Sequence, residues 1–314
     1  MRSSQISRVP VPVLVGPTAS GKTALTEQIH KRFPSVEIIS ADSRQIYIGM
    51  NIGTAKPSGE FLERIPHHLV DIIHPDVAYS AGKFARDAGE AIQAVLQRGN
   101  IPLVAGGTGF YIRALFEGLK APAADPAIYA ELEKRMKNEG YDALLSELHR
   151  IDPDAARILP SENRSKTFRA LACYYQTGVP YTRFLDEGRT FESPFEPMVF
   201  CLLPERAQLY ERINQRTVQM VEDGLVEETK GLVDAGYSAG SPGMKTVGYK
   251  EALEFLDGNI SLGEMTGAIQ QATRRYAKRQ MTWFRGQLPE NTAYADSPEN
   301  WSEWFSQVVA GLEG

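Results

Sequence analysis

The stretch that decides the fold is Gly16-Pro17-Thr18-Ala19-Ser20-Gly21-Lys22-Thr23. It fits the pattern GxxxxGK[ST], in which backbone N–H groups turn inward and cradle phosphate oxygens. An apolar, β-branched run at 11–15 precedes it, and residues 23–33 follow with helical spacing. A strand before the loop and a helix after it are the context that the motif requires, so the stretch predicts a P-loop and not an ordinary glycine-rich turn.

Two side chains of this loop carry specific expectations. Lys22 would reach the outer phosphate, and the hydroxyl of Thr23 would hold Mg²⁺ or a phosphate oxygen. The N-terminus of the following helix adds a dipole that favours an anion. We therefore predict that Gly16–Thr23 binds a diphosphate or a triphosphate.

The segments around the P-loop predict an α/β fold. Strand-like runs alternate with helical segments, with strands at 11–15, 36–39 and 101–105 and helices at 23–33 and 81–96. Such alternation is typical of a parallel sheet with right-handed crossovers.

The pattern changes in the middle of the chain, which predicts an inserted domain. Residues 126–178 are mostly helical, and strand character returns only at 198–203. Stretches rich in proline lie on both sides of the helical part. The prediction is a P-loop NTPase-like parallel sheet core with a helical insertion domain and a helical C-terminal section, divided as core at 1–121 and 194–314 and insertion at 122–193.

Composition limits the classes of function. The chain has 314 residues, 42 % of them hydrophobic, and a net charge of −5, so any nucleic-acid binding must come from a local basic patch. No run is long and apolar enough for a membrane span, and no signal peptide precedes the first strand. Cys173 and Cys201 form no metal-binding pattern, and we expect buried thiols in a reducing, cytoplasmic compartment.

Further candidate residues follow the second and third strands. Asp42 comes just after the second strand, where a carboxylate can face the P-loop ligand and accept a proton from an attacking group. The alternative is a helix cap or an Asx turn. Gly106-Gly107-Thr108-Gly109 follows the third strand and would allow close backbone approach to a ligand, or would form a tight turn.

No clear second magnesium-binding strand follows, since the run at 69–71 is short, and this weakens an ATPase interpretation. His67 and His68, with Asp71 close behind, could suggest a metal site. No further strong metal ligand lies nearby in the sequence, so a turn or capping role is expected for these residues.

Two groups of cations complete the candidates. Arg212 and Arg216 lie four residues apart on one helical face, and one of them could close over a diphosphate unless both lie on a solvated surface. The segment 272–286 has five cations and no acid, with aromatic residues between them, a composition that suits RNA phosphates and unpaired bases. The alternative is a solvated helix face on which Trp283 or Phe284 simply belongs to the core. The cations of the segment are Arg274, Arg275, Lys278, Arg279 and Arg285.

In order and spacing these segments resemble the tRNA dimethylallyltransferases, over residues 11–286. The matching stretches include GPTASGKTAL at 16–25, ADSRQIY at 41–47, GGTGFYIRAL at 106–115 and TRRYAKRQMTWFR at 273–285. The resemblance implies transfer of the dimethylallyl group of dimethylallyl diphosphate to N6 of the adenosine 3′ of the anticodon, in tRNAs that read codons beginning with U. In this family the P-loop binds the donor diphosphate, assisted by Mg²⁺.

The resemblance also implies residue roles. Asp42 would act as general base, Lys22 and Thr23 would hold the diphosphate with the assistance of Mg²⁺, and Arg216 would bind the leaving diphosphate. The anticodon stem-loop of tRNA would contact two groups of residues besides Asp42: Ser43, Arg44, Gln45 and Thr108 near the target nucleotide, and Ser165, Lys166, Thr167, Phe168, Arg169, Arg274, Arg275, Lys278 and Arg279 along the insertion and the basic helix. A monomer is expected.

The chain departs from the family pattern at Ile48, Lys166, Ala172 and Lys245. These departures concern tRNA contact and not the proposed chemistry. Three rival interpretations stay open: a small-molecule kinase that uses ATP, an isopentenyltransferase acting on free adenylate, and a non-catalytic RNA-binding module switched by a nucleotide. The basic, aromatic-rich segment argues against the first two.

Overall fold

The computed structural model describes residues 8–119, 121–122, 125–160, 162–186 and 193–313. They form two compact units, the first made of Met1–Phe116 and Ser193–Gly314 and the second of Glu117–Glu192. Boundaries at 122 and 193 were expected from the sequence. In the described part of the chain no helix combines the length and apolar character that crossing a membrane requires.

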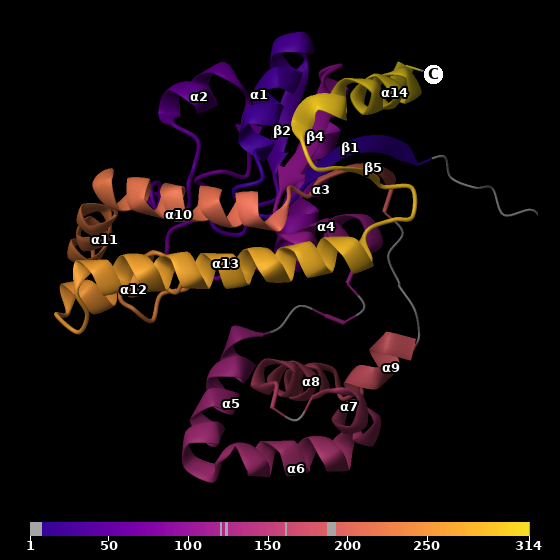
Figure 1. Cartoon of the computed structure of the whole chain (residues 1–314). Helices are drawn as coiled ribbons and strands as arrows, with labels where there is room; N and C mark the ends of the chain where they lie inside the picture. The colour runs from indigo at the N-terminus through magenta and orange to yellow at the C-terminus, as the bar shows by residue number, and fades with distance from the viewer. Residues whose placement is uncertain (1–7, 120, 123–124, 161, 187–192, 314) are drawn as a thin grey trace, which may run out of the picture. The chain divides into compact units, whose positions relative to one another are not determined.

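The first unit is built on a six-stranded parallel sheet with the strand order β3-β2-β4-β1-β5-β6. Of these strands, Figure 1 labels β1, β2, β4 and β5. The predicted α/β fold is confirmed, and the strand predicted at 198–203 indeed returns to the sheet, as β5 beside β1. The two edge strands were missed because they are too short to show a pattern. The strands are β1 (Val9–Val15), β2 (Val36–Ser40), β3 (His67–His68), β4 (Ile101–Gly106), β5 (Phe195–Leu202) and β6 (Ala293–Ala295).

Helices cover both faces of this sheet. The connection from β1 to β2 passes over β4, and the connection from β2 to β4 runs back, so right-handed crossovers place their helices on opposite faces. On one face the apolar side chains of the sheet pack against Leu25 and Ile29 and against Trp301 and Phe305. The helices are α1 (Lys22–Arg32), α2 (Gly59–Arg64), α3 (Ala81–Gln97), α4 (Gly109–Glu117) and α14 (Trp301–Glu313), the last after the short 3₁₀ turn η1 (Pro298–Asn300).

A second group of helices follows β5, and its longest member is α13, which lies beside α10 (Figure 1). A capping box at Ser261 and Glu264 begins α13, and its face toward α10 contributes Ala277 and Met281 to a shared apolar cluster. The helical C-terminal section is thereby confirmed. These helices are α10 (Arg206–Glu222), α11 (Leu225–Asp234), α12 (Tyr249–Leu256) and α13 (Leu262–Gln287).

Beside the edge strand, the buried carboxylate of Glu37 is surrounded by three donors. Its carboxylate accepts hydrogen bonds from Arg98 Nη2 at 2.7 Å, Asn100 Nδ2 at 2.6 Å and His68 Nε2 at 2.7 Å. His67 and His68 form the edge strand β3, so the turn or capping role expected for them is wrong.

The second unit consists of helices around a small apolar core that includes Leu144, Leu148 and Leu171. Asp152 is buried in it and accepts hydrogen bonds from the N–H and hydroxyl of Thr182 at 2.9 and 2.6 Å. Because these donors satisfy the carboxylate, the two segments are tied together inside the unit. Its helices are α5 (Pro126–Glu139), α6 (Tyr141–Ile151), α7 (Pro153–Ile158), α8 (Arg164–Thr177) and α9 (Tyr181–Asp186).

Candidate active site

Three loops meet where the parallel strands β1, β2 and β4 end. They carry the P-loop, Asp42 and the Gly106–Gly109 turn, and together with α10 and α13 they enclose a cavity of about 520 Å³. The expectation that these segments share one edge is therefore confirmed, although β4 separates β1 from β2. Residues 18–23 and the side chains of Asp42, Gln45, Arg216 and Arg279 are among those that line the cavity.

The backbone of the P-loop explains two of its glycines. Gly21 precedes α1 with φ of 101°, a conformation that side-chain-bearing residues rarely adopt. Gly16 packs so closely against β5 that an added Cβ would lie 2.5 Å from the carbonyl oxygen of Leu202. The loop can therefore turn tightly between β1 and α1, which leaves the N-terminus of α1 facing the cavity.

Lys22 is held against the carbonyl side of the same loop. Its ammonium donates hydrogen bonds to the carbonyl oxygens of Gly16 at 2.9 Å and Pro17 at 2.8 Å. Burial lowers the pKa of Lys22 to about 8, with Asp42 opposing this effect and Arg216 adding to it. An anion bound in the cavity would favour the charged form, so Lys22 is suited to bind phosphate oxygens.

Arg216 reaches the P-loop from α10. Its Nη2 donates to Thr18 Oγ1 at 2.6 Å, and burial lowers the pKa of its guanidinium while Asp42 opposes that shift. Arg212, one turn earlier, also lines the cavity. Of the two alternatives for this pair, the structure supports the one in which an arginine faces the P-loop.

Asp42 forms the Asx turn that the sequence offered as an alternative, and its role as a base stays a prediction. Its Oδ1 accepts the backbone N–H of Arg44 at 2.8 Å and of Gln45 at 3.4 Å, which is an Asx turn, and the residue also lines the cavity. Thr108 fixes the neighbouring turn, since its hydroxyl accepts the N–H of Ser43 at 3.0 Å. The carboxylate is thereby oriented by backbone on one side and available to a ligand on the other.

Gln280 on α13 was missed by the sequence analysis. Its side-chain oxygen accepts the N–H of Thr18 at 2.9 Å, and its side-chain nitrogen donates to the carbonyl oxygen of Gly107 at 2.8 Å. One buried amide thus ties α13 to both the P-loop and the turn after β4. The spacing of Ile269, Thr273, Tyr276 and Gln280 puts them on one helical face, but only the structure shows that this face lines the cavity.

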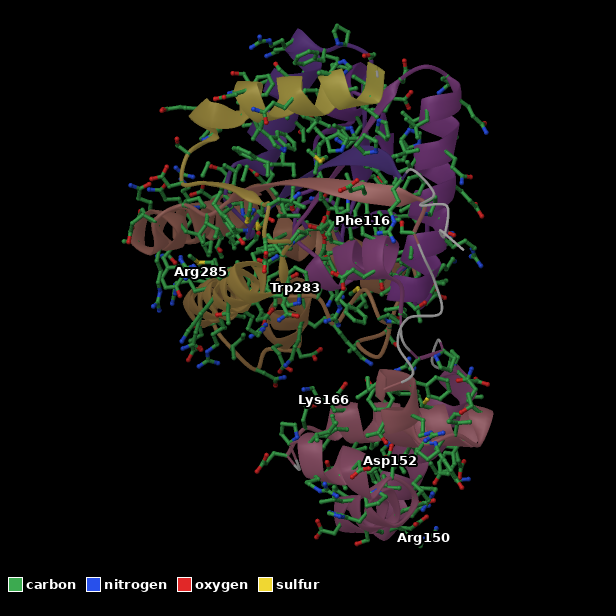
Figure 2. The ribbon with its side chains drawn as sticks, turned by 90° about the vertical axis from the view of Figure 1, so that its right-hand side faces the viewer. Phe116, Arg150, Asp152, Lys166, Trp283 and Arg285 are labelled. Atoms are coloured by element: carbon green, nitrogen blue, oxygen red, sulfur yellow. The ribbon has the colours of Figure 1, made fainter. Side chains whose placement is uncertain are left out.

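The predicted RNA-binding cations of α13 occupy different environments. Arg275, Lys278 and Arg279 are exposed, whereas Arg274 is half-buried and donates to Asn214 Oδ1 on α10 at 2.5 Å. Arg285 is exposed near the end of the helix (Figure 2). Trp283 packs on Gly109, where an added Cβ would lie 2.3 Å from the ring of Trp283. The aromatic residues between the cations therefore serve packing, at least at Trp283.

The predicted RNA-contacting residues of the second unit also differ. Ser165 and Lys166 are exposed on α8, but Thr167 and Phe168 are buried in the core of that unit. Lys166 is labelled in Figure 2. Arg169 donates to the carbonyl oxygens of Ala121 and Pro122. The buried side chains cannot touch a ligand without rearrangement, so Ser165 and Lys166 are the better candidates.

The structure also shows where the residues that depart from the family pattern lie. Lys245 lines the cavity and Ile48 is exposed, while Ala172 is buried in the core of the second unit.

Among the described residues no group of three or more His, Cys, Asp or Glu side chains is arranged to hold a metal ion. A protein cage for a metal is thus lacking in that part of the chain. The cavity does offer the exposed Thr23 at the start of α1. Mg²⁺ typically takes one or two protein oxygens and completes its shell with substrate phosphates and water, and Thr23 fits that kind of site.

Comparisons with known proteins point to one family. Residues 45–287 match the family model described as IPP transferase. A tRNA dimethylallyltransferase of Geobacter sulfurreducens is 44 % identical over 280 residues, which make up 89 % of this chain and 90 % of that protein.

Solved structures agree with this. A tRNA isopentenylpyrophosphate transferase from Bacillus halodurans is 35 % identical, with a TM-score of 0.68, over 98 % of this chain and 97 % of that one. A eukaryotic dimethylallyltransferase, described as acting on tRNA, is 25 % identical with a TM-score of 0.77, over 96 % of this chain and 77 % of its own.

Proposed function

Because the chain belongs to the IPP transferase family, a family of prenyl-transferring enzymes, we propose that it modifies tRNA with a dimethylallyl group. The donor is dimethylallyl diphosphate, and the acceptor is N6 of the adenosine next to the anticodon, position 37, in tRNAs that read UNN codons. The observation that carries this proposal is that a phosphate-binding loop, an arginine and an oriented carboxylate line one cavity.

The donor's diphosphate binds at the P-loop in this proposal. The N-terminus of α1 and the ammonium of Lys22 provide positive potential there, and Arg216 lies close enough to contact Thr18. When the bond between the allylic carbon and the diphosphate oxygen breaks, negative charge grows on the leaving group. Lys22 and Arg216 are placed to stabilise that charge in a cavity partly closed to water.

The acceptor amine binds on the opposite side of the allylic carbon. An exocyclic amine is a weak nucleophile, so its positioning in line with the leaving group contributes much of the rate. Asp42 accepts the proton that N6 loses as the new carbon–nitrogen bond forms. A stacked base of the anticodon loop cannot reach this depth, so the adenosine must flip into the cavity at a cost of a few kcal/mol.

Mg²⁺ is the proposed cofactor. The hydroxyl of Thr23 would hold the ion together with diphosphate oxygens and water. When bound, the ion supplies further positive charge to the diphosphate.

The tRNA would lie along the exposed cations of α13. Arg275, Lys278 and Arg279 offer contacts to phosphates, and Ser165 and Lys166 offer contacts from the second unit. A net charge of −5 for the whole chain makes such local patches necessary for binding an anion. The chain is proposed to act as a monomer.

The test is a transfer assay with radiolabelled dimethylallyl diphosphate, Mg²⁺ and unmodified tRNA that carries adenosine after its anticodon. The Asp42→Asn variant is the sharpest probe, because its side-chain oxygen can still accept the N–H groups of Arg44 and Gln45 while it can no longer take a proton. The parent should transfer label to tRNA, and the variant should not. Both proteins should bind tRNA with equal affinity.

The rival interpretations give different outcomes. Label in free AMP but not in tRNA would indicate a free-adenylate enzyme, and phosphoryl transfer from ATP to a small hydroxyl compound would indicate a kinase. Full activity of Asp42→Asn would remove Asp42 as the base.

A further inference from the structure

A second cavity adjoins the active-site cavity. It also measures about 520 Å³, and it is lined mainly by residues 51–62 and by the C-terminal half of α10. The two cavities have three lining residues in common, Ala55, Arg216 and Met220. These three residues therefore lie at the boundary between the two spaces, and we call them the partition.

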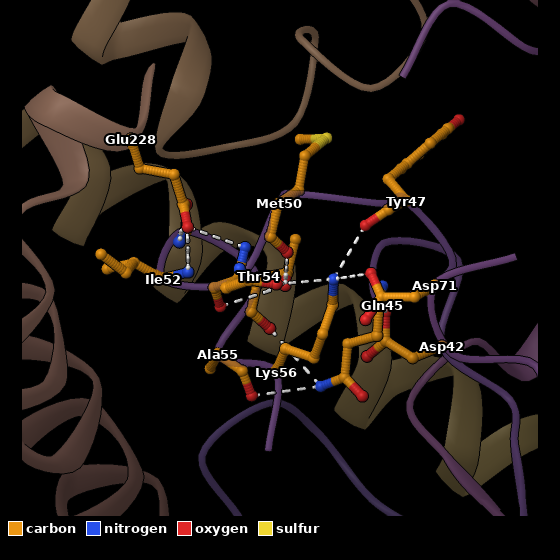
Figure 3. Close-up of polar contacts among 12 residues, drawn as sticks. Asp42, Gln45, Tyr47, Met50, Ile52, Thr54, Ala55, Lys56, Asp71 and Glu228 are labelled. Carbon is orange, nitrogen blue, oxygen red and sulfur yellow. Dashed lines mark hydrogen bonds and ion pairs between the residues drawn. The ribbon is translucent and has the colours of Figure 1, made fainter. Parts of the chain in front are cut away.

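The loop side of this partition is held from two directions (Figure 3). The carboxylate of Glu228 on α11 accepts the N–H of Asn51 at 2.9 Å, of Ile52 at 3.0 Å and of Gly53 at 3.3 Å. Three consecutive backbone donors around one carboxylate fix the start of the loop.

Lys56 holds the other end of the same loop (Figure 3). Its side chain is only 2 % exposed, and its ammonium donates to the carbonyl oxygen of Tyr47 at 2.8 Å, to Asn51 Oδ1 at 2.9 Å and to Asp71. The carbonyl oxygen of Ala55 is bonded by Gln45 Nε2 at 3.2 Å. Moving Ala55 would disturb these polar contacts, so this part of the partition is held in place.

The helix side contains the adaptable part. Arg216 is charged and bonded to Thr18, and Ala55 has no side chain beyond Cβ. Met220 is half-buried on α10 and has a long, flexible thioether that can fill irregular space. Among the three shared residues, Met220 is therefore the one with a long, apolar and flexible side chain.

The hydrocarbon of the donor must lie on the apolar side of the cavity. With the diphosphate at the P-loop and the amine at Asp42, the remaining apolar lining is Ala55, Met220, Val247 and Ile269. Burial of the allylic methyl groups against these side chains is favourable.

We propose that Met220 sets the chain-length limit of the donor. Its side chain closes the active-site cavity behind the five-carbon group, and the adjoining cavity would receive a longer chain if the partition were opened. This inference rests on the proposed function. The chemistry is unchanged by chain length: the bond from C1 to the diphosphate oxygen breaks, the bond from C1 to N6 forms, and the N6 proton passes to Asp42.

The experiment compares dimethylallyl diphosphate with the ten-carbon geranyl diphosphate for the parent, Met220→Ala, Met220→Leu and Val218→Ala. A hydrophobic pocket discriminates by roughly 10- to 200-fold for one methylene of misfit, so Met220→Ala should raise the geranyl-to-dimethylallyl ratio of kcat/KM by about tenfold or more. Met220→Leu keeps most of the volume and should keep the parent ratio. Val218 is 43 % exposed on the same helix and controls for general effects on α10.

The outcomes separate this inference from the function on which it rests. Geranyl transfer by Met220→Ala, with the two controls at the parent ratio, supports the partition. An active parent together with a Met220→Ala variant that retains activity and still rejects the geranyl donor overturns the inference alone. A parent that transfers neither group to tRNA overturns both. If Met220→Ala is inactive with both donors, calorimetry measures the binding of inorganic diphosphate and of geranyl diphosphate to the parent and to the variant. An open partition must raise the affinity for geranyl diphosphate relative to inorganic diphosphate in the variant. A relative affinity equal to that of the parent overturns the inference.

Discussion

Replacing Gln280 with methionine tests how α13 is joined to the phosphate site. The variant keeps a side chain of similar length but removes the bonds to the Thr18 N–H at 2.9 Å and to the Gly107 carbonyl oxygen at 2.8 Å. Each polar group stranded in this buried place costs about 1–3 kcal/mol. Because the apolar side chain regains part of this through burial, we expect a net loss of about 1–3 kcal/mol in the free energy of unfolding.

The same change should weaken donor binding, since Thr18 sits in the P-loop and loses the contact that positions its backbone. The assay combines urea unfolding with the KM for dimethylallyl diphosphate, and Thr282→Ala is the matched control on α13. Thr282 is exposed, and its hydroxyl donates only to the carbonyl oxygen of Lys278 in its own helix. The reasoning is refuted if Gln280→Met matches this control in both unfolding free energy and donor KM.

Three further perturbations have expected signs. Burial lowers the pKa of Lys22 to about 8, so its charge is present below that pH and lost above it, and kcat/KM for the donor should fall about tenfold per pH unit above 8. This fall should vanish from the pH profile of Lys22→Ala; its persistence would assign the titration to another group. Arg279→Ala should weaken tRNA binding and reduce the slope of log affinity against log salt by about one unit, and an unchanged slope would show that Arg279 meets no phosphate. Burial alone would raise the pKa of Glu37, but hydrogen bonds led by that of Arg98 outweigh it and lower the pKa to about 2. Its contribution to the free energy of unfolding is therefore present above pH 4.5 and lost as the pH falls toward 2. In acid unfolding, the Glu37→Gln variant should show a smaller change of unfolding free energy with pH between those two values than the parent does. Equal dependence in parent and variant would contradict this assignment.

Local patterns predicted much of the fold because they need only neighbours in sequence. The buried strands at 11–15, 36–39 and 101–105 and the helix at 81–96 follow from apolar periodicity, and the P-loop follows from its glycine spacing. The edge strands β3 and β6 span only 2 and 3 residues, too few for any period to appear. Their pairing is set by the strands beside them.

Side-chain environments on the helices were harder to predict. Phe168 lies in a stretch chosen for RNA contact, yet it packs in the core of the second unit. Arg274 belongs to the basic segment but is used to join α13 to α10 through Asn214. Charge and aromatic content indicate that a segment can bind RNA. Which of its side chains face outward depends on which face of the helix packs against the rest of the fold.

The sequence by itself determined the parallel α/β core, the phosphate-binding loop and the carboxylate that follows the second strand, because each depends on a short run of residues. The tertiary structure decided which distant residues complete the site. Arg216 and Gln280 lie 198 and 262 residues from Thr18, and both contact it only because α10 and α13 pack across the carboxyl ends of the strands. Hydrogen bonds between such distant groups depend on how the helices pack, which no local sequence period encodes.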